Sequence, residues 1–114
     1  MSNELDKQLK VLEKADVVAF GGVGFAGQIL PETEAYHAVA ERLTDDLRPK
    51  LDKLLRKGTP EGKVYAASLL ARLDPAAGRE AWERLSGNTA KVDTFTGCVK
   101  ARTTLAEYAS SHRN

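Results

Sequence analysis

The centre of the chain, residues 57–67, reads Lys57-Gly58-Thr59-Pro60-Glu61-Gly62-Lys63-Val64-Tyr65-Ala66-Ala67. Gly58 follows a leucine-rich segment, and glycine is common just past the end of a helix. Thr59 and Pro60 are typical of an N-cap residue and the first helical position. From Val64 onward, apolar residues recur at helical spacing. This stretch therefore predicts that one helix ends, a tight turn follows and a second helix begins.

Similar signals extend the helical prediction towards both ends of the chain. Apolar residues recur three or four positions apart with charged residues between them, which is typical of amphipathic helices. Asp74, and either Thr103 or Thr104, are suitable N-caps for the last two predicted helices. We predict five or six helices, at approximately residues 3–20, 32–43, 45–57, 60–73, 75–86 and 104–110.

Two segments fit the helical pattern less well. Thr44, followed by Asp45 and Asp46, provides an N-cap and an acidic first turn for the helix over residues 45–57. Pro49 would kink that helix unless it falls within the first turn. Residues 86–103 combine turn-like glycine and asparagine with β-branched residues, so we predict an ordered loop there.

Helices of this length joined by short turns favour antiparallel helical pairs. Residues 31–58 and 59–87 resemble HEAT-type helical hairpins, although a solenoid usually needs about three repeats. We therefore predict an all-α fold in a single domain, residues 1–114, arranged either as a short HEAT-like α-solenoid or as a compact bundle.

Composition and charge limit the classes of function. The chain is 42% hydrophobic and 29% charged, as in an ordinary globular protein, and its formal net charge is only +1. A general nucleic-acid-binding domain normally carries a marked basic excess, so nucleic acid is not an expected partner. Residues 1–6 are polar, no apolar run is long enough to span a membrane, and the single Cys98 cannot form an internal disulfide. A cytoplasmic location is expected.

A glycine-rich motif at residues 22–27, Gly22-Val23-Gly24-Phe25-Ala26-Gly27, matches the G-x-G-x-x-G fingerprint of dinucleotide-binding proteins. That fingerprint binds pyrophosphate between a parallel strand and a helix, with further βα units beyond it. Here Pro31 falls where the helix should be in its first turns, and no later segment alternates strands with helices. Nucleotide binding is therefore only the alternative interpretation of this motif. We favour a tight loop between two helices, anchored in the core by Phe25 and Ile29, with no cofactor.

Two other residues carry reactive side chains. His37 lies three residues from Glu34 and four from Glu41, a spacing that could hold a metal ion. A lone surface histidine between helix carboxylates is more commonly ion-paired, so we predict no metal site. Cys98 has no histidine placed to act as its base, and we predict a partly buried apolar residue there. The chain is therefore predicted not to be an enzyme, with no catalytic residues and no small-molecule substrate.

Charge is distributed unevenly along the middle of the chain. Acids exceed bases by four between residues 32 and 46, and bases exceed acids by four between residues 48 and 63. The acidic residues, which we name the acidic patch, are Glu32, Glu34, Glu41, Asp45 and Asp46. The basic residues are Arg48, Lys50, Lys53, Arg56, Lys57 and Lys63. These sets are either the solvated outer faces of two helices or surfaces that steer a charged partner, and we predict that the acidic patch binds a partner.

The order of several short segments resembles a group of small bacterial helical proteins. The segments are residues 23–27, 34–36 and 54–67 and the late pair Gly97-Cys98. Some members of that group resemble immunity proteins of toxin–immunity systems, including contact-dependent growth inhibition. The similarity spans residues 20–98, and residues 58–67 are its most specific part.

The resemblance implies a cytoplasmic antitoxin that binds and neutralises a cognate toxin protein, without catalytic residues of its own. Many such toxins are nucleases with basic grooves, for which the acidic patch is a natural complement. A toxin of another activity could instead contact the basic helix or residues 92–102. The alternative from another class is a HEAT-like interaction scaffold or adaptor with no toxin partner.

Overall fold

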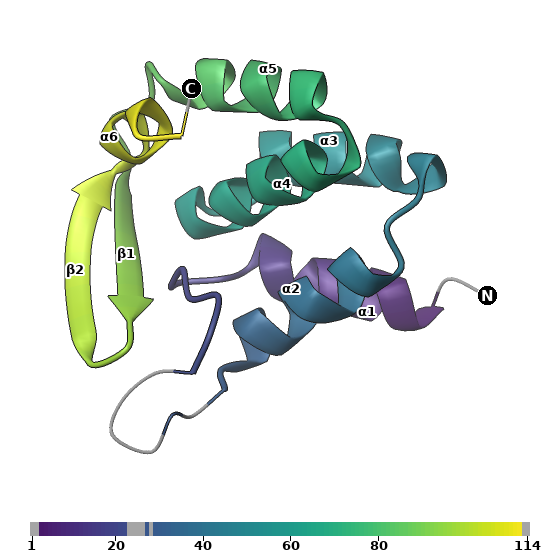
Figure 1. Ribbon diagram of the computed structural model, residues 1–114, viewed down its shortest axis with the longest axis horizontal. Coiled ribbons are helices and arrows are strands. Elements are labelled where there is room, and N and C mark those ends of the chain that lie inside the picture. The colour runs from purple at the N-terminus through teal and green to yellow at the C-terminus, as the bar shows by residue number, and fades with distance from the viewer. Residues whose placement is uncertain (1–2, 23–26, 28, 113–114) are drawn as a thin grey trace.

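Helix α4 (Pro60–Leu73) lies at the centre of the computed structural model, where it contacts α1, α2, α3 and α5 (Figure 1). Its start confirms the predicted cap, because the Thr59 hydroxyl accepts a hydrogen bond from the Gly62 amide at 3.0 Å. Pro60 occupies the first turn, where its missing N–H costs no helical hydrogen bond. The cap therefore fixes where the central helix begins.

The structure describes residues 3–22, 27 and 29–112. The remaining helices are α1 (Asn3–Glu13), α2 (Pro31–Glu41), the 3₁₀ helix η1 (Asp45–Leu47), α3 (Arg48–Lys57), α5 (Pro75–Leu85) and α6 (Leu105–Ser110). The strands β1 (Lys91–Thr96) and β2 (Val99–Thr104) lie between α5 and α6. Two further caps are confirmed, since Asp74 accepts from the Ala76 amide and Thr104 from the Glu107 amide, each at 3.1 Å.

The prediction of an all-α fold is wrong, because a two-stranded antiparallel sheet stands where an ordered loop was expected. β1 and β2 pair along their whole length, from Lys91 with Thr104 to Thr96 with Val99. Their β-branched residues favour this extended backbone. Gly97 closes the turn at φ 57°, a left-handed conformation that glycine adopts without a Cβ penalty. The fold is a mixed α and β globule rather than a HEAT-like solenoid or an all-helical bundle.

The first helix is also shorter than predicted, ending at Glu13 instead of near residue 20. Val18 instead forms a parallel bridge with Thr94 of β1. The Val18 amide donates to the Asp93 carbonyl at 2.8 Å, and the Phe95 amide donates to the Val18 carbonyl at 2.9 Å. Pairing with the distant strand therefore replaces the helix that the local apolar pattern predicted.

The awkward position of Pro49 is resolved by a late start of α3. Residues 45–47 form η1, and α3 begins at Arg48, so Pro49 lies in the first turn. Thr44 has the extended backbone of an N-cap, but its side chain accepts no capping hydrogen bond. The helix predicted over residues 45–57 is therefore a 3₁₀ turn followed by a shorter α-helix.

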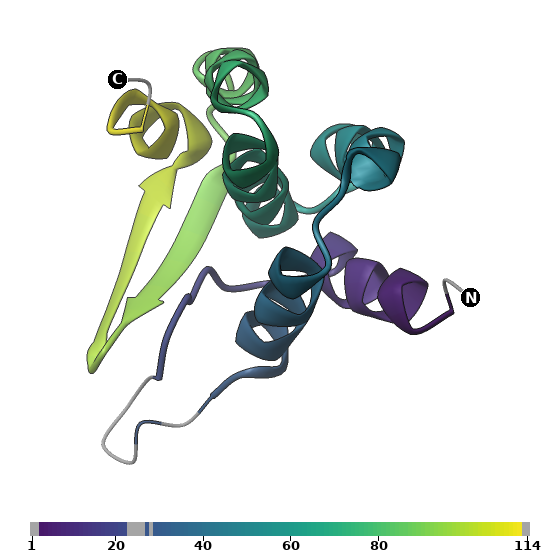
Figure 2. The same ribbon diagram turned by 45° about the vertical axis from the view of Figure 1, so that its right-hand side comes forward.

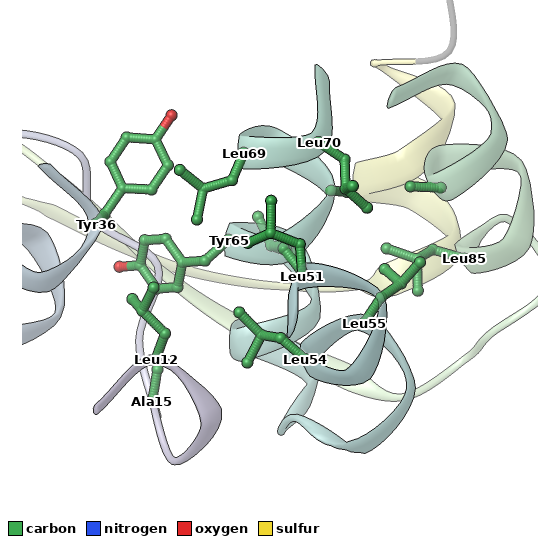
Figure 3. Packing of buried hydrophobic residues seen from close by; sticks show 14 of the residues in the cluster. Leu12, Ala15, Tyr36, Leu51, Leu54, Leu55, Tyr65, Leu69, Leu70 and Leu85 are labelled. Carbon is green, nitrogen blue, oxygen red and sulfur yellow. The ribbon is translucent and has the colours of Figure 1, made fainter. Parts of the chain in front are cut away.

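The core is formed by helix faces that meet around α4, with α3 packed on one side and α1 and α2 on another. Figure 3 shows Tyr65 between Tyr36 and Leu12, with Leu51 and Leu54 of α3 nearby. All five side chains are buried, as expected for apolar and aromatic residues at helical spacing.

The hydroxyl of Tyr65 also helps to hold residues 17–20 in place through hydrogen bonds to their backbone. Its hydroxyl accepts a hydrogen bond from the Ala19 amide at 2.8 Å and lies 3.1 Å from the carbonyl oxygens of both Val17 and Ala19. The Thr33 hydroxyl donates to the Ala19 carbonyl at 2.7 Å. Burial raises the pKa of Tyr65, so the hydroxyl keeps its proton at neutral pH. Side chains therefore satisfy a backbone segment that lacks a regular ladder.

Candidate partner-binding surfaces

The acidic patch lies on α2 and on η1. Glu34 and Glu41 are seven residues apart on α2, which is close to two helical turns, so they share one outward stripe. Asp45 and Asp46 follow in η1. All four of these side chains are exposed. The structure thus brings four of the five predicted residues onto the outer surface of neighbouring elements.

Glu32 does not belong to that stripe. It is two residues from Glu34, about 200° around the helix, and it is only half-exposed. It lies four residues before Tyr36 and seven before Val39, both of them buried, so it lies on the side of α2 that faces the core. The acidic patch is therefore restricted to Glu34, Glu41, Asp45 and Asp46.

The four carboxylates of the acidic patch are available to a partner. Among the described residues, none of them makes a hydrogen bond or an ion pair through its side chain. Carboxylates that stay fully hydrated and unpaired give up no internal contact when they meet a cation. The patch can therefore provide negative charge to a basic surface at little cost to the fold.

His37 lies on the same outer side of α2 but bonds elsewhere. Its Nε2 lies 3.0 Å from the Phe20 carbonyl oxygen, so Nε2 carries the proton and donates. The structure therefore gives His37 a backbone partner in place of the predicted ion pair with Glu34 or Glu41. Within the described ranges, no group of histidine, cysteine or acidic side chains is arranged to hold a metal ion.

The basic residues are partly engaged in holding helices together. Arg48 pairs with Asp74 at 3.5 Å, and Lys50 pairs with Asp6 of α1. These pairs are solvent-exposed, so each contributes only about 0–1 kcal/mol. The remaining exposed bases of α3 are Lys53, Arg56 and Lys57. The basic helix is thus a less open charged surface than the acidic patch.

The glycine-rich motif keeps only part of the context that nucleotide binding needs. Residues 23–26, including Phe25, lie outside the described residues. The preceding segment is extended and makes a parallel bridge to β1, but the sheet of the described chain is an antiparallel pair without βα units. Ile29 is 47% exposed, so the prediction that it anchors the loop in the core is wrong. The geometry adds nothing in favour of a dinucleotide site.

The hairpin of β1 and β2 stands where residues 92–102 were expected as an alternative contact surface, but its strands were not predicted. Its turn carries Cys98, which is exposed, so the prediction of a partly buried cysteine is wrong. One face borders a cleft of about 460 Å³ between residues 18–22, the turn and Tyr108. Figure 2 shows the hairpin projecting from the helical body beside the extended segment that follows α1. The alternation of β-branched residues after residue 91 was the signal that could have revealed it.

A buried carboxylate fixes this hairpin to the central helix. Glu61 is only 7% exposed, and its Oε2 accepts a hydrogen bond from the Asp93 amide at 2.9 Å. The Asp93 side chain in turn receives two hydrogen bonds from the Arg102 guanidinium, at 2.6 and 3.3 Å. The Arg102 bonds lower the pKa of Asp93, so this exposed pair stays charged at neutral pH. β1 is therefore connected to α4 on one side and to β2 on the other.

We expect Glu61→Ala to lower the free energy of unfolding by about 1–2 kcal/mol, because the Asp93 amide loses its acceptor in a part-buried site. Glu61→Gln should retain most of the stability, since its side-chain carbonyl can accept the same bond. Urea unfolding of the two variants measures the difference. Equal losses in both would show that the hydrogen bond is not what matters at this position.

No family model, curated protein or solved structure matches this chain. No helix in the part of the chain that the structure describes is long and apolar enough to cross a membrane. The fold and its surfaces define a small helix-rich protein with one acidic stripe and one projecting hairpin.

Proposed function

We propose that this chain is an immunity protein that binds a toxin protein in the bacterial cytoplasm and neutralises it. The observation that carries the proposal is the acidic patch, with four exposed carboxylates on α2 and η1 that have no partner among the described residues. Unpaired charge of one sign steers and orients a partner of the opposite sign. The resemblance of residues 20–98 to small bacterial immunity proteins supports the same class.

The mechanism requires only binding. A nuclease toxin has a basic groove for the phosphates of its substrate, and the acidic patch presents negative charge to that groove or to its rim. Glu34 and Glu41 are about 10.5 Å apart along the axis of α2, so they can meet two separate cations of the toxin at once. Occupying the groove excludes the substrate, and no catalytic residue of this chain takes part.

An interaction adaptor without a toxin partner is the second candidate. The projecting hairpin favours it, because β2 is exposed along most of its length and Val99 is 64% exposed. We expect an adaptor to bind several different proteins, or to bind no protein whose gene lies next to its own. The two candidates therefore differ in the identity of the partner.

The test is co-expression with the C-terminal toxin domain encoded immediately upstream. We expect the tagged toxin domain and this chain to co-purify as a stoichiometric complex that survives gel filtration. A catalytically inactive toxin variant allows the experiment to be run without killing the host. Separation of the two proteins on the column would contradict the immunity proposal and favour the adaptor.

A further inference from the structure

The outer edge of β2 carries backbone groups without a partner in the described part of the chain. On β1, the Asp93 amide and carbonyl and the Phe95 amide point away from β2, towards Glu61 and Val18. Backbone groups alternate in direction along a strand, so the ladder of the hairpin is formed by Val92, Thr94 and Thr96. Their partners on β2 are Thr103, Ala101 and Val99.

It follows that Lys100 and Arg102 direct their N–H and C=O groups outward. Both residues are exposed, and no backbone hydrogen bond from either reaches another described segment. In Figure 1 and Figure 2, β2 is the outermost element on its side of the molecule, with β1 between it and the helices. An open strand edge of this kind is a template for a further strand.

The same two residues place positive charge on one face of the edge. Lys100 and Arg102 lie opposite Phe95 and Asp93, so all four side chains share a face. Arg102 is paired with Asp93, while the Lys100 ammonium lies 5.7 Å from the centre of the Phe95 ring and makes no ion pair with a described residue. This face borders a groove of about 650 Å³ that is also lined by Asp16, Val17 and Leu30. A strand added here would set its own side chains beside the two cations.

We propose that the free edge of β2 binds an extended segment of a partner protein that carries acidic side chains two residues apart. The added strand hydrogen-bonds to the outward groups of Lys100 and Arg102, and its two acids lie beside their side chains, about 5 Å away between Cβ atoms. This site is separate from the acidic patch and does not depend on the immunity proposal.

A second copy of this chain is a poorer occupant of the edge. If two β2 strands pair antiparallel about a twofold axis, the outward residues of one meet the outward residues of the other. If both outward residues of each strand form hydrogen bonds across the twofold axis, each opposed pair consists of two basic residues. Lys100 or Arg102 of one copy then faces Lys100 or Arg102 of the other. Like charges directly opposite each other destabilise a strand pair. Charge on the edge therefore opposes self-association and selects an acidic strand.

The test uses a capped peptide, Thr-Thr-Glu-Val-Glu-Thr-Thr, and a control peptide with lysine in place of both glutamates. We expect the acidic peptide to shift the NMR amide signals of Lys100 and Arg102 and to slow their hydrogen exchange. Lys100→Glu should weaken its binding about tenfold and improve binding of the lysine peptide. Lys53→Glu on α3 makes the same change in net charge far from the edge and should leave both affinities within about twofold.

Lys100→Pro provides a second variant, because it removes an outward N–H without removing a bond to β1. It should weaken the acidic peptide about tenfold as well. The proposal is overturned if the acidic peptide causes no shifts on β2 at about 1 mM, or if Lys53→Glu weakens binding as much as Lys100→Glu. Concentration-dependent dimers with protected Lys100 and Arg102 amides would also overturn it, since the occupant would then be a second copy.

Discussion

Gly78→Ala and Gly62→Ala should each lower the free energy of unfolding by about 2–3 kcal/mol, although alanine is the better helix former by roughly 1 kcal/mol. A Cβ built at Gly78 on α5 would lie 2.4 Å from the Cβ and 2.5 Å from the Cα of Ala71 on α4. A Cβ at Gly62 would lie 2.4 Å from the Leu12 carbonyl oxygen. Neither obstacle is a flexible side chain, so the helices must move apart. The close approach of α4 to α5, and that of α1 to α4, therefore depends on glycine at the contact.

Gly87→Ala is the matched control, because a Cβ at Gly87 meets no atom within 4 Å. Its stability should change by no more than about 0.5 kcal/mol. Chemical denaturation of the three variants gives the comparison directly. If Gly78→Ala were more stable than the unmodified chain, the close packing of α4 on α5 would be incorrect.

The double charge reversal Glu34→Lys with Glu41→Lys should weaken binding of the toxin domain about 100-fold. The reversal replaces attraction by repulsion at two positions on one stripe of α2. The effect should shrink as salt is added, because screening shortens the reach of exposed charges to about 8–10 Å near physiological ionic strength. Titration calorimetry at two salt concentrations measures both the affinity and its salt dependence.

The matched control is the pair Glu80→Lys with Glu83→Lys, which makes the same change in net charge at two exposed acids of α5. It should weaken binding only a few-fold, through the overall charge of the molecule. Glu34 lies in the first turn of α2, where a lysine costs about 0.3–1 kcal/mol against the helix dipole. Thermal melts of both variants are therefore needed to show that the fold is intact. Equal weakening by the two pairs would place the interface elsewhere.

The sequence was informative wherever a structural signal is local. The caps at Thr59 and Asp74 were predicted, and the last cap was narrowed to Thr103 or Thr104, because capping depends on a side chain and amides two or three residues away. The helices that follow these caps therefore begin where they were expected. Most of the acidic patch was also found, since charge counting needs no fold, but only helical geometry separates Glu32 from Glu34.

Features that depend on distant partners were missed. Residues 15–20 have an apolar pattern that fits a helix, but pairing with β1 and hydrogen bonds to the Tyr65 and Thr33 hydroxyls hold this segment in a non-helical conformation. The hairpin itself was taken for a loop because its β-branched residues lie among turn-forming ones. The close contact of Gly78 with Ala71 is likewise a property of two packed helices and not of either segment alone. Tertiary contacts override local preference in each case.

The most direct measurement of the immunity proposal is growth of cells that express the active toxin domain together with this chain. We predict full growth with the unmodified chain and with the Glu80→Lys, Glu83→Lys control, and growth arrest with the Glu34→Lys, Glu41→Lys variant at equal protein levels. Growth arrest in the presence of the unmodified chain would contradict the immunity function. Full protection by the Glu34→Lys, Glu41→Lys variant would leave that function standing and contradict the acidic patch as its interface.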